Sequence, residues 1–197
     1  MKTLAISLKI FLFFTVLTGI IYPLLVTGIA QFVFPFKANG SIIIKNNVSI
    51  GSDLIGQKFD STIYFSSRPS AVDYNPLPSG GSNIALTNVK LKEQLTQRKK
   101  QFIAINHLDS KATVPSEMLF ASASGLDPHI SPMAASMQLD RIVKARNLTT
   151  VQKQQLIHLI AELTESPQYL LLGEARVNVL RLNLALDALN HTNSTNK

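Results

Sequence analysis

Residues 10–36, IFLFFTVLTGIIYPLLVTGIAQFVFPF, form an uninterrupted apolar stretch between Lys9 and Lys37. None of its 27 residues is Asp, Glu, Lys, Arg or His. A bilayer core of about 30 Å is crossed by roughly 20 apolar helical residues, so the stretch is long enough to span a membrane. We therefore predict a transmembrane anchor helix at 10–36, preceded by a short N-terminal lead at 1–9.

A cleaved signal peptide is the alternative explanation of this stretch. Lys2 and Lys9 form a basic start, and residues 28–30 (Gly-Ile-Ala) resemble a cleavage site. However, the apolar core of a signal peptide has only about 7–15 residues, whereas here it continues past Ala30. We expect the segment to be retained as an anchor in the lipid bilayer.

Two features of the anchor favour packing against another membrane helix. Pro23 removes one helical N–H donor, a loss that membrane helices tolerate when a neighbour supplies a replacement. Gly19 and Gly28 lack side chains and let a second helix approach closely. We predict that these two glycines are helix-packing positions.

The chain beyond the anchor is long enough for one ordinary domain, which we place at 37–190, followed by a disordered polar tail at 191–197. From residue 38 onward the charge is only slightly basic, with 16 Lys or Arg against 12 Asp or Glu. These charges are scattered and have no aromatic residues between them, which argues against a nucleic-acid partner. The absence of cysteine excludes disulfides and thiolate metal sites.

Local patterns predict a mixed α/β (α+β) domain. A β-branched stretch at 41–50 with Asn46-Asn47 at its centre indicates a hairpin, and Pro and Gly make 73–83 a loop. We expect the other elements at the following positions: extended pieces at 51–59 and 64–70, a helix from Thr87 to about 105, a helix start at 114–117, helices at 131–146 and from 149, a strand at 177–182 and a short helix at 183–189.

Two special loops carry the candidate site residues. Ser79-Gly80-Gly81-Ser82-Asn83 has the composition of a backbone nest for an anion, although it is not a Walker A motif. In the second loop, Asp127 and His129 flank a proline, which suggests either a hydrolase-like pair or a structural Asx turn. No Gly-x-Ser-x-Gly motif accompanies them, so we assign no catalytic residue.

Polar residues on the predicted helix and strand can form either a buried structural network or contacts to a ligand. Gln138 and Arg141, three residues apart, share a helix face, while Arg176 and Asn178 alternate on one side of the predicted strand. The four histidines are isolated in sequence and show no metal-ligand spacing, so we expect no metal site.

Several ordered strings closely resemble the C subunit family of the Kdp potassium-transporting ATPase. They are YFxxRPSA (64–71), SGGSN (79–83), TN (87–88), ASxSGLDPHISPxAA (121–135) and GExRVNVLxLNLALD (173–187). The resemblance covers nearly the whole chain, including the anchor. One departure is Ala175, which stands where the family usually has proline.

This resemblance implies a single-pass accessory subunit of an ATP-driven potassium-uptake complex in the bacterial cytoplasmic (inner) membrane. Its partners would be a potassium-channel-like subunit and a P-type ATPase subunit, and the chain itself lacks the Asp-Lys-Thr-Gly-Thr motif of the hydrolase. The family has been described as a catalytic chaperone that raises the ATP affinity of the ATPase subunit. No cofactor is expected to bind tightly, and ATP would act through the complex.

The resemblance also implies roles for particular residues. Nucleotide-binding positions would be Ser79, Gly80, Gly81, Ser82 and Gln138. From the residues themselves, and not from the resemblance, we expect a structural polar cluster or partner contact that comprises Arg68, Asn83, Asp127, His129, Arg176 and Asn178.

The orientation follows from the short basic lead before the first apolar segment. Such a lead usually stays inside, and a long following domain is translocated regardless of its own charge. We therefore expect a cytoplasmic N-terminus and a periplasmic C-terminal domain. The other class of function left open is a membrane-anchored extracytoplasmic ligand-binding domain or hydrolase.

Overall fold

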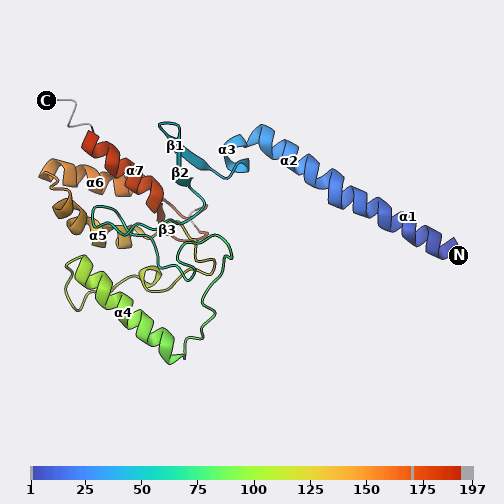
Figure 1. Ribbon diagram of the computed structural model, residues 1–197. Coiled ribbons are helices and arrows are strands. Elements are labelled where there is room, and N and C mark those ends of the chain that lie inside the picture. Colours follow the sequence, from blue (N-terminus) through green and yellow to red (C-terminus); the bar gives the residue numbers. More distant parts are fainter. Residues whose placement is uncertain (1, 170, 192–197) are drawn as a thin grey trace. The chain divides into compact units, whose positions relative to one another are not determined.

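The computed structural model describes residues 2–169 and 171–191 and divides into two compact units, Met1–Ile50 and Gly51–Lys197. Helices and strands occur together, with one long apolar helix at the N-terminal end, as predicted from the sequence (Figure 1).

The first unit is dominated by one continuous helical segment, Lys2–Val33, which is long and apolar enough to cross a membrane. It consists of α1 (Lys2–Val16), a π-helical turn η1 (Leu17–Ile21) and α2 (Tyr22–Val33), and none of its side chains is buried. The helix stops because Phe34 precedes a proline and leaves the helical conformation (φ −133°, ψ 55°). A short helix α3 (Pro35–Ala38) follows.

A β-hairpin follows α3, as the sequence predicts. Strands β1 (Ile42–Lys45) and β2 (Val48–Ser52) pair with each other. The two turn residues, Asn46 and Asn47, have φ values of 53° and 60°. Two consecutive positive φ angles match a type I′ turn, which asparagine tolerates better than most residues.

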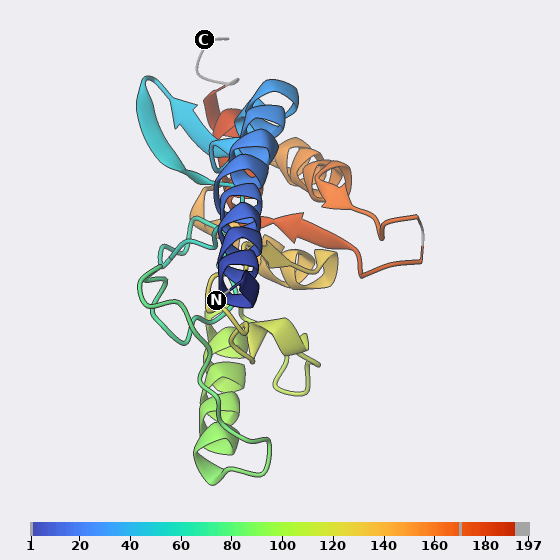
Figure 2. The same ribbon diagram turned by 90° about the vertical axis from the view of Figure 1, so that its right-hand side faces the viewer.

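The second unit begins with Gly51 and Ser52, the last two residues of β2, and continues as an irregular stretch to Asn88. Its regular elements are α4 (Val89–Ile105), a 3₁₀ turn η2 (Ser116–Met118), β3 (His129–Ile130), α5 (Pro132–Ala145), α6 (Thr150–Glu162), β4 (Thr164–Glu165), β5 (Arg176–Asn178) and α7 (Val179–His191). Figures 1 and 2 show α4 at one end of this unit and α7 at the other.

The predicted caps of α5 and α6 are confirmed. Ser131 Oγ accepts a hydrogen bond from the Ala134 N–H (3.0 Å), and Asn147 ends the first of these helices with φ 52°. Thr149 and Gln152 form a reciprocal capping box at the start of α6. Helix α4 differs slightly, since its cap is Asn88 and not Thr87.

Two element predictions are wrong. Residues 114–117 lead only into the 3₁₀ turn, and the strand predicted at 177–182 ends at Asn178. Asn178 Oδ1 accepts from the Arg181 N–H (3.2 Å), a local bond that starts α7. The apolar residues of this stretch also fit a helical period, because Leu182 and Leu186 are both fully buried.

A three-stranded antiparallel sheet, ordered β3-β5-β4, brings distant parts of the second unit together (Figure 2). His129 lies opposite Asn178, and Val177 pairs with both Ile130 and Thr164. The core beside this sheet includes Phe65, Ile142, Leu156 and Val177, each fully buried. Because Arg176 is two residues before Asn178 on β5, it lies on the same face of the sheet as His129.

Residues 62–66 are held by side chains and not by a strand ladder. Asn183 accepts from the Phe65 N–H (2.8 Å) and donates to its carbonyl (3.0 Å). Gln138 accepts from the Ser66 N–H (2.8 Å). These two buried amides supply the backbone partners that a neighbouring strand would otherwise provide.

Candidate functional site

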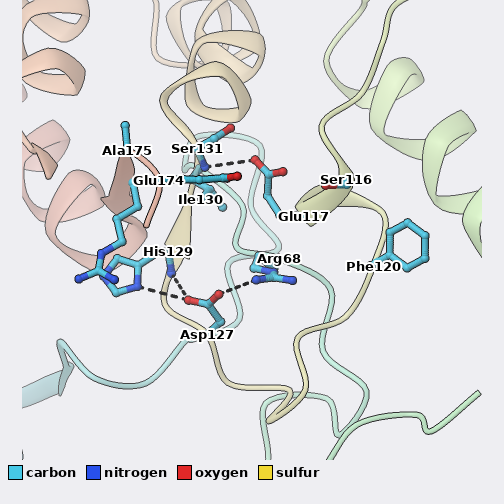
Figure 3. Close-up of a pocket in the computed structure, with 11 residues that line it drawn as sticks. Arg68, Ser116, Glu117, Phe120, Asp127, His129, Ile130, Ser131, Glu174 and Ala175 are labelled. Carbon is cyan, nitrogen blue, oxygen red and sulfur yellow. Dashed lines mark hydrogen bonds and ion pairs between the residues drawn. The ribbon is translucent and has the colours of Figure 1, made fainter. Parts of the chain in front are cut away.

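The candidate site is a polar pocket of about 470 Å³ beside β3 and β5 (Figure 3). Its side chains come from four segments that the sheet register and the loops bring together. The lining residues are Arg68, Ser116, Glu117, Phe120, Asp127, His129, Ile130, Ser131, Glu174, Ala175 and Arg176. The predicted cluster members Arg68, Asp127, His129 and Arg176 thus surround one cavity.

An ion pair forms one wall of the pocket. Arg68 Nη1 lies 2.5 Å from Asp127 Oδ2, and the other oxygen of Asp127 accepts from the His129 N–H (3.0 Å) and lies 3.3 Å from His129 Nδ1. The bond to the His129 backbone is an Asx turn, the structural alternative considered from the sequence. Arg68 Nε is buried without a hydrogen-bond partner among the described residues.

The surroundings of Asp127 keep it ionised. Burial alone raises the pKa of Asp127, but hydrogen bonds from the side chain and backbone of His129 and from Arg68 outweigh burial and lower the pKa to about 2. Asp127 is therefore a permanent anion at neutral pH. It can orient His129 and hold Arg68, but it cannot donate a proton.

The opposite wall of the pocket carries carboxylates that sequence analysis missed. Glu117 Oε1 accepts from the Ser131 N–H (3.2 Å), and Figure 3 shows the Glu174 side chain directed toward the same region. Arg176 Nε pairs with Glu165 across the sheet (3.0 Å). The pocket therefore offers both signs of charge, and Ser131 Oγ is occupied in capping α5.

The Ser79–Asn83 loop lies against the loop that contains Asp127, but it does not line the pocket. Ser79 Oγ donates to the Ser124 carbonyl (3.1 Å). A Cβ added at Gly81 would lie 2.9 Å from the Ala123 carbonyl oxygen, whereas one added at Gly80 would meet nothing within 4 Å. Close loop packing therefore requires a glycine at position 81 and not at position 80.

Gln138 lies in the interior, with no exposed surface. Its oxygen accepts from the Ser66 N–H and from Arg141 Nη2 (2.9 Å), and its nitrogen lies 3.3 Å from the Ala134 carbonyl oxygen. In this arrangement both polar atoms of the amide are engaged. The predicted nucleotide contact by Gln138 remains a prediction.

Arg141 and Asn178 also bind within the second unit. Arg141 donates to the carbonyls of Thr62 and Tyr64 and to Asn106 Oδ1, and burial lowers the pKa of its guanidinium. Asn178 is buried and donates to the Asp53 carbonyl (2.8 Å). These contacts join the irregular stretch to α5 and β5.

Nothing in the described residues gathers three His, Asp or Glu side chains into a metal-binding group. The pocket itself contains an Asp-His pair, but the hydroxyl group of Ser131, one of the two serines that line the pocket, serves as a helix cap. The arrangement suits recognition of a charged or polar group better than covalent catalysis.

Comparison with known proteins identifies the family. A family model described as KdpC, the K+-transporting ATPase c chain, matches residues 4–188. The chain belongs to the KdpC family. The match includes the long apolar helix and almost all of the second unit.

Curated KdpC relatives are similar over almost their full length. The potassium-transporting ATPase KdpC subunit of Escherichia coli O127:H6 is 45% identical over 192 residues, which cover 96% of this chain and 99% of the relative. The KdpC subunit of Photorhabdus laumondii is 46% identical over 186 residues, covering 93% and 94%. That of Shigella dysenteriae serotype 1 is 44% identical over 192 residues, covering 96% and 99%.

Family membership makes the chain an accessory subunit of the Kdp potassium-transporting ATPase complex. The one candidate membrane helix found within residues 2–169 and 171–191 fits a single-pass subunit of a transporter. Sequence analysis found Arg68, Asp127 and His129 because they lie in distinctive loops. It missed Glu117 and Glu174 because ordinary glutamates give no local signal until the fold brings their segments together.

Proposed function

We propose that this chain is a non-catalytic subunit that stabilises the assembled potassium transporter and raises the ATP affinity of its ATPase subunit through the membrane helices. The observation that carries the proposal is the apolar helix Lys2–Val33, which has no buried side chain and offers a large surface to other membrane helices. In such a complex, the ATPase subunit and a potassium-channel-like subunit would be the partners.

The proposed orientation places the N-terminus in the cytoplasm and the second unit in the periplasm, beside the inner membrane. A domain on that side has no access to cytosolic ATP. An effect on ATP affinity would then require the chain to bind two states of the pump with different affinity. The complete burial of Gln138 supports this indirect role, because its amide is not free to contact a nucleotide.

The orientation can be tested with single cysteines, since the chain has none of its own. Ser110→Cys lies in an exposed turn of the second unit, and Thr3→Cys lies on the other side of the anchor. We expect a membrane-impermeant maleimide added to spheroplasts to label position 110 and not position 3. Labelling of position 110 only after permeabilisation would make direct ATP contact the leading mechanism.

The functional role can be tested by measuring the KM for ATP of the purified complex, with and without this chain. We expect the KM to rise when the chain is removed, while the remaining subunits still hydrolyse ATP. A chain that hydrolyses ATP alone would contradict the non-catalytic role. An unchanged KM would show that the chain contributes to assembly of the complex and not to its ATP affinity.

A ligand-binding role of the second unit is the other candidate, and the polar pocket around Asp127 favours it. Isothermal titration of the purified full-length chain with inorganic phosphate and with ATP tests this role directly. Saturable binding that Arg68→Ala abolishes would support ligand binding by the pocket.

A further inference from the structure

We propose that the π-helical turn in the membrane helix is a docking notch for a hydrogen-bond donor on a membrane helix of another transporter subunit. The inference rests on the proposed assembly role and names the chemistry of the contact. The notch comprises the η1 turn, Leu17–Ile21, with Pro23 following it.

The notch arises from a mismatch in backbone hydrogen bonding. In an α-helix the Gly19 carbonyl would accept from the N–H of residue 23, but that residue is proline and has none. The Thr18 carbonyl would accept from the Tyr22 N–H, which instead donates to the Leu17 carbonyl. Two consecutive carbonyl groups, those of Thr18 and Gly19, thus lose their usual donors.

Neighbouring side chains do not repair this loss. Thr15 Oγ1 donates to the Phe11 carbonyl (2.8 Å), and Thr18 Oγ1 donates to the Phe14 carbonyl (2.7 Å). Both hydroxyl hydrogens therefore point back toward the N-terminus and away from the notch. Hydroxyl oxygens themselves accept and cannot satisfy a carbonyl.

The surface beside the two carbonyls is open. A Cβ added at Gly19 would meet nothing within 4 Å, and the side chains of residues 18–22 are exposed. Water is absent from the bilayer core, where an unsatisfied backbone group costs several kcal/mol. A neighbouring helix that brings a hydroxyl, amide or indole N–H donor to this level therefore gains a strong acceptor.

A different subunit fits this notch better than a second copy of the chain. The chain belongs to a family of potassium-transporting ATPase subunits, so membrane helices of other subunits are available as partners. Among the hydroxyl groups of residues 15–22, those of Thr15 and Thr18 already donate within their own helix, and a second copy could bring only the Tyr22 hydroxyl to this depth. The occupant is thus a membrane helix of another subunit that supplies the missing donor. Gly19 lets its backbone approach closely.

The first test restores the missing donor. Pro23→Ala supplies an N–H at position 23, and Pro35→Ala is the control, because a proline in the first turn of α3 replaces an N–H that has no helical partner. Binding of the full-length chain to the other subunits is measured in mild detergent. One interhelical hydrogen bond predicts about three- to twenty-fold weaker binding for Pro23→Ala and unchanged binding for Pro35→Ala.

Steric blocking and photo-cross-linking provide two further matched pairs. Gly19→Leu is expected to weaken binding, whereas Ala5→Leu in the first helical turns is not. By helical geometry, Phe11 lies about 20° from the notch residue Thr18 around the axis, while Phe13 lies about 140° away. A benzophenone amino acid at position 11 should therefore cross-link another subunit more strongly than one at position 13.

Each result has a defined meaning. Normal binding by Pro23→Ala, equal cross-linking from positions 11 and 13, or a cross-linked product of two copies of this 21.6-kDa chain would overturn the notch. In these cases the wild-type chain still binds, and the proposed assembly role survives. Failure of the wild-type chain to bind the other subunits would overturn both proposals.

Discussion

Replacing Asp127 by alanine tests whether the polar pocket stabilises the second unit. The change removes the acceptor for Arg68 Nη1 at 2.5 Å and for the His129 N–H at 3.0 Å. Each charged or buried donor left without its acceptor costs about 1–3 kcal/mol. Because 30% of the Asp127 side chain is exposed, water replaces part of the loss, and we expect a total destabilisation of about 2 kcal/mol.

Urea unfolding of the full-length chain in mild detergent measures this change. The half-buried residues Tyr64 and Tyr74 report on the second unit, and the chain contains no tryptophan. For a slope of about 2 kcal/mol per molar urea, the midpoint should fall by about 1 M. Asp73→Ala is the matched control, because Asp73 pairs with Lys58 at 2.9 Å but its side chain is 78% exposed, so its loss should change little.

The pH dependence provides a second check. The pKa of Asp127 is about 2 in the folded chain, below its ordinary value of 3.8, so its contribution to stability is present above pH 4 and is lost as the pH falls toward 2. The stability difference between the wild type and Asp127→Ala should therefore shrink over that range. Equal midpoints for the wild type and Asp127→Ala at pH 7, or equal losses for the two Asp→Ala variants, would refute the reasoning.

Three other variants test separate parts of the second unit. Gly81→Ala should lower the thermal midpoint, because the added Cβ would lie 2.9 Å from the Ala123 carbonyl oxygen, while Gly80→Ala should not lower it. Equal midpoints for the two variants would show that close packing at residue 81 does not determine the stability of the loop. Burial raises the pKa of Tyr74 to about 12, so stability should fall between pH 10 and 12 in the wild type and less in Tyr74→Phe, as measured by urea unfolding. Gln138→Leu should cost about 2–4 kcal/mol by orphaning two donors, and an unchanged midpoint with lost ATP affinity would instead indicate nucleotide contact.

The parts of the fold that sequence analysis predicted are those determined by local chemistry. A helix cap such as Ser131 needs only its own side chain and the next few backbone groups, and the Asn46-Asn47 turn likewise depends on its own φ angles. The end of β5 was mispredicted because Val177 and Leu182 suit both a strand and a helix. The choice depends on which of these residues the core buries, which is a tertiary effect.

Sequence analysis predicted some of the residues that line the pocket but not the others. Distinctive loops pointed to Arg68, Asp127 and His129, and the structure brings all three to one pocket. Glu117 and Glu174 belong to segments 57 residues apart, and only the fold brings both to the pocket. Likewise, no local pattern indicates that Gln138 would bond to Ser66 and not face solvent.

The side-chain hydrogen bonds that hold residues 62–66 determine when this segment can fold during synthesis of the chain. The partners of this segment lie on α5 and on α7, and Asn183 is among the last residues of the described chain. The segment is therefore synthesised early but can be fixed only after Asn183 has left the ribosome, when the anchor is already available for insertion. We expect a chain that ends before Asn183 to insert normally but to remain sensitive to protease within 51–70, and protection of this region would contradict that order.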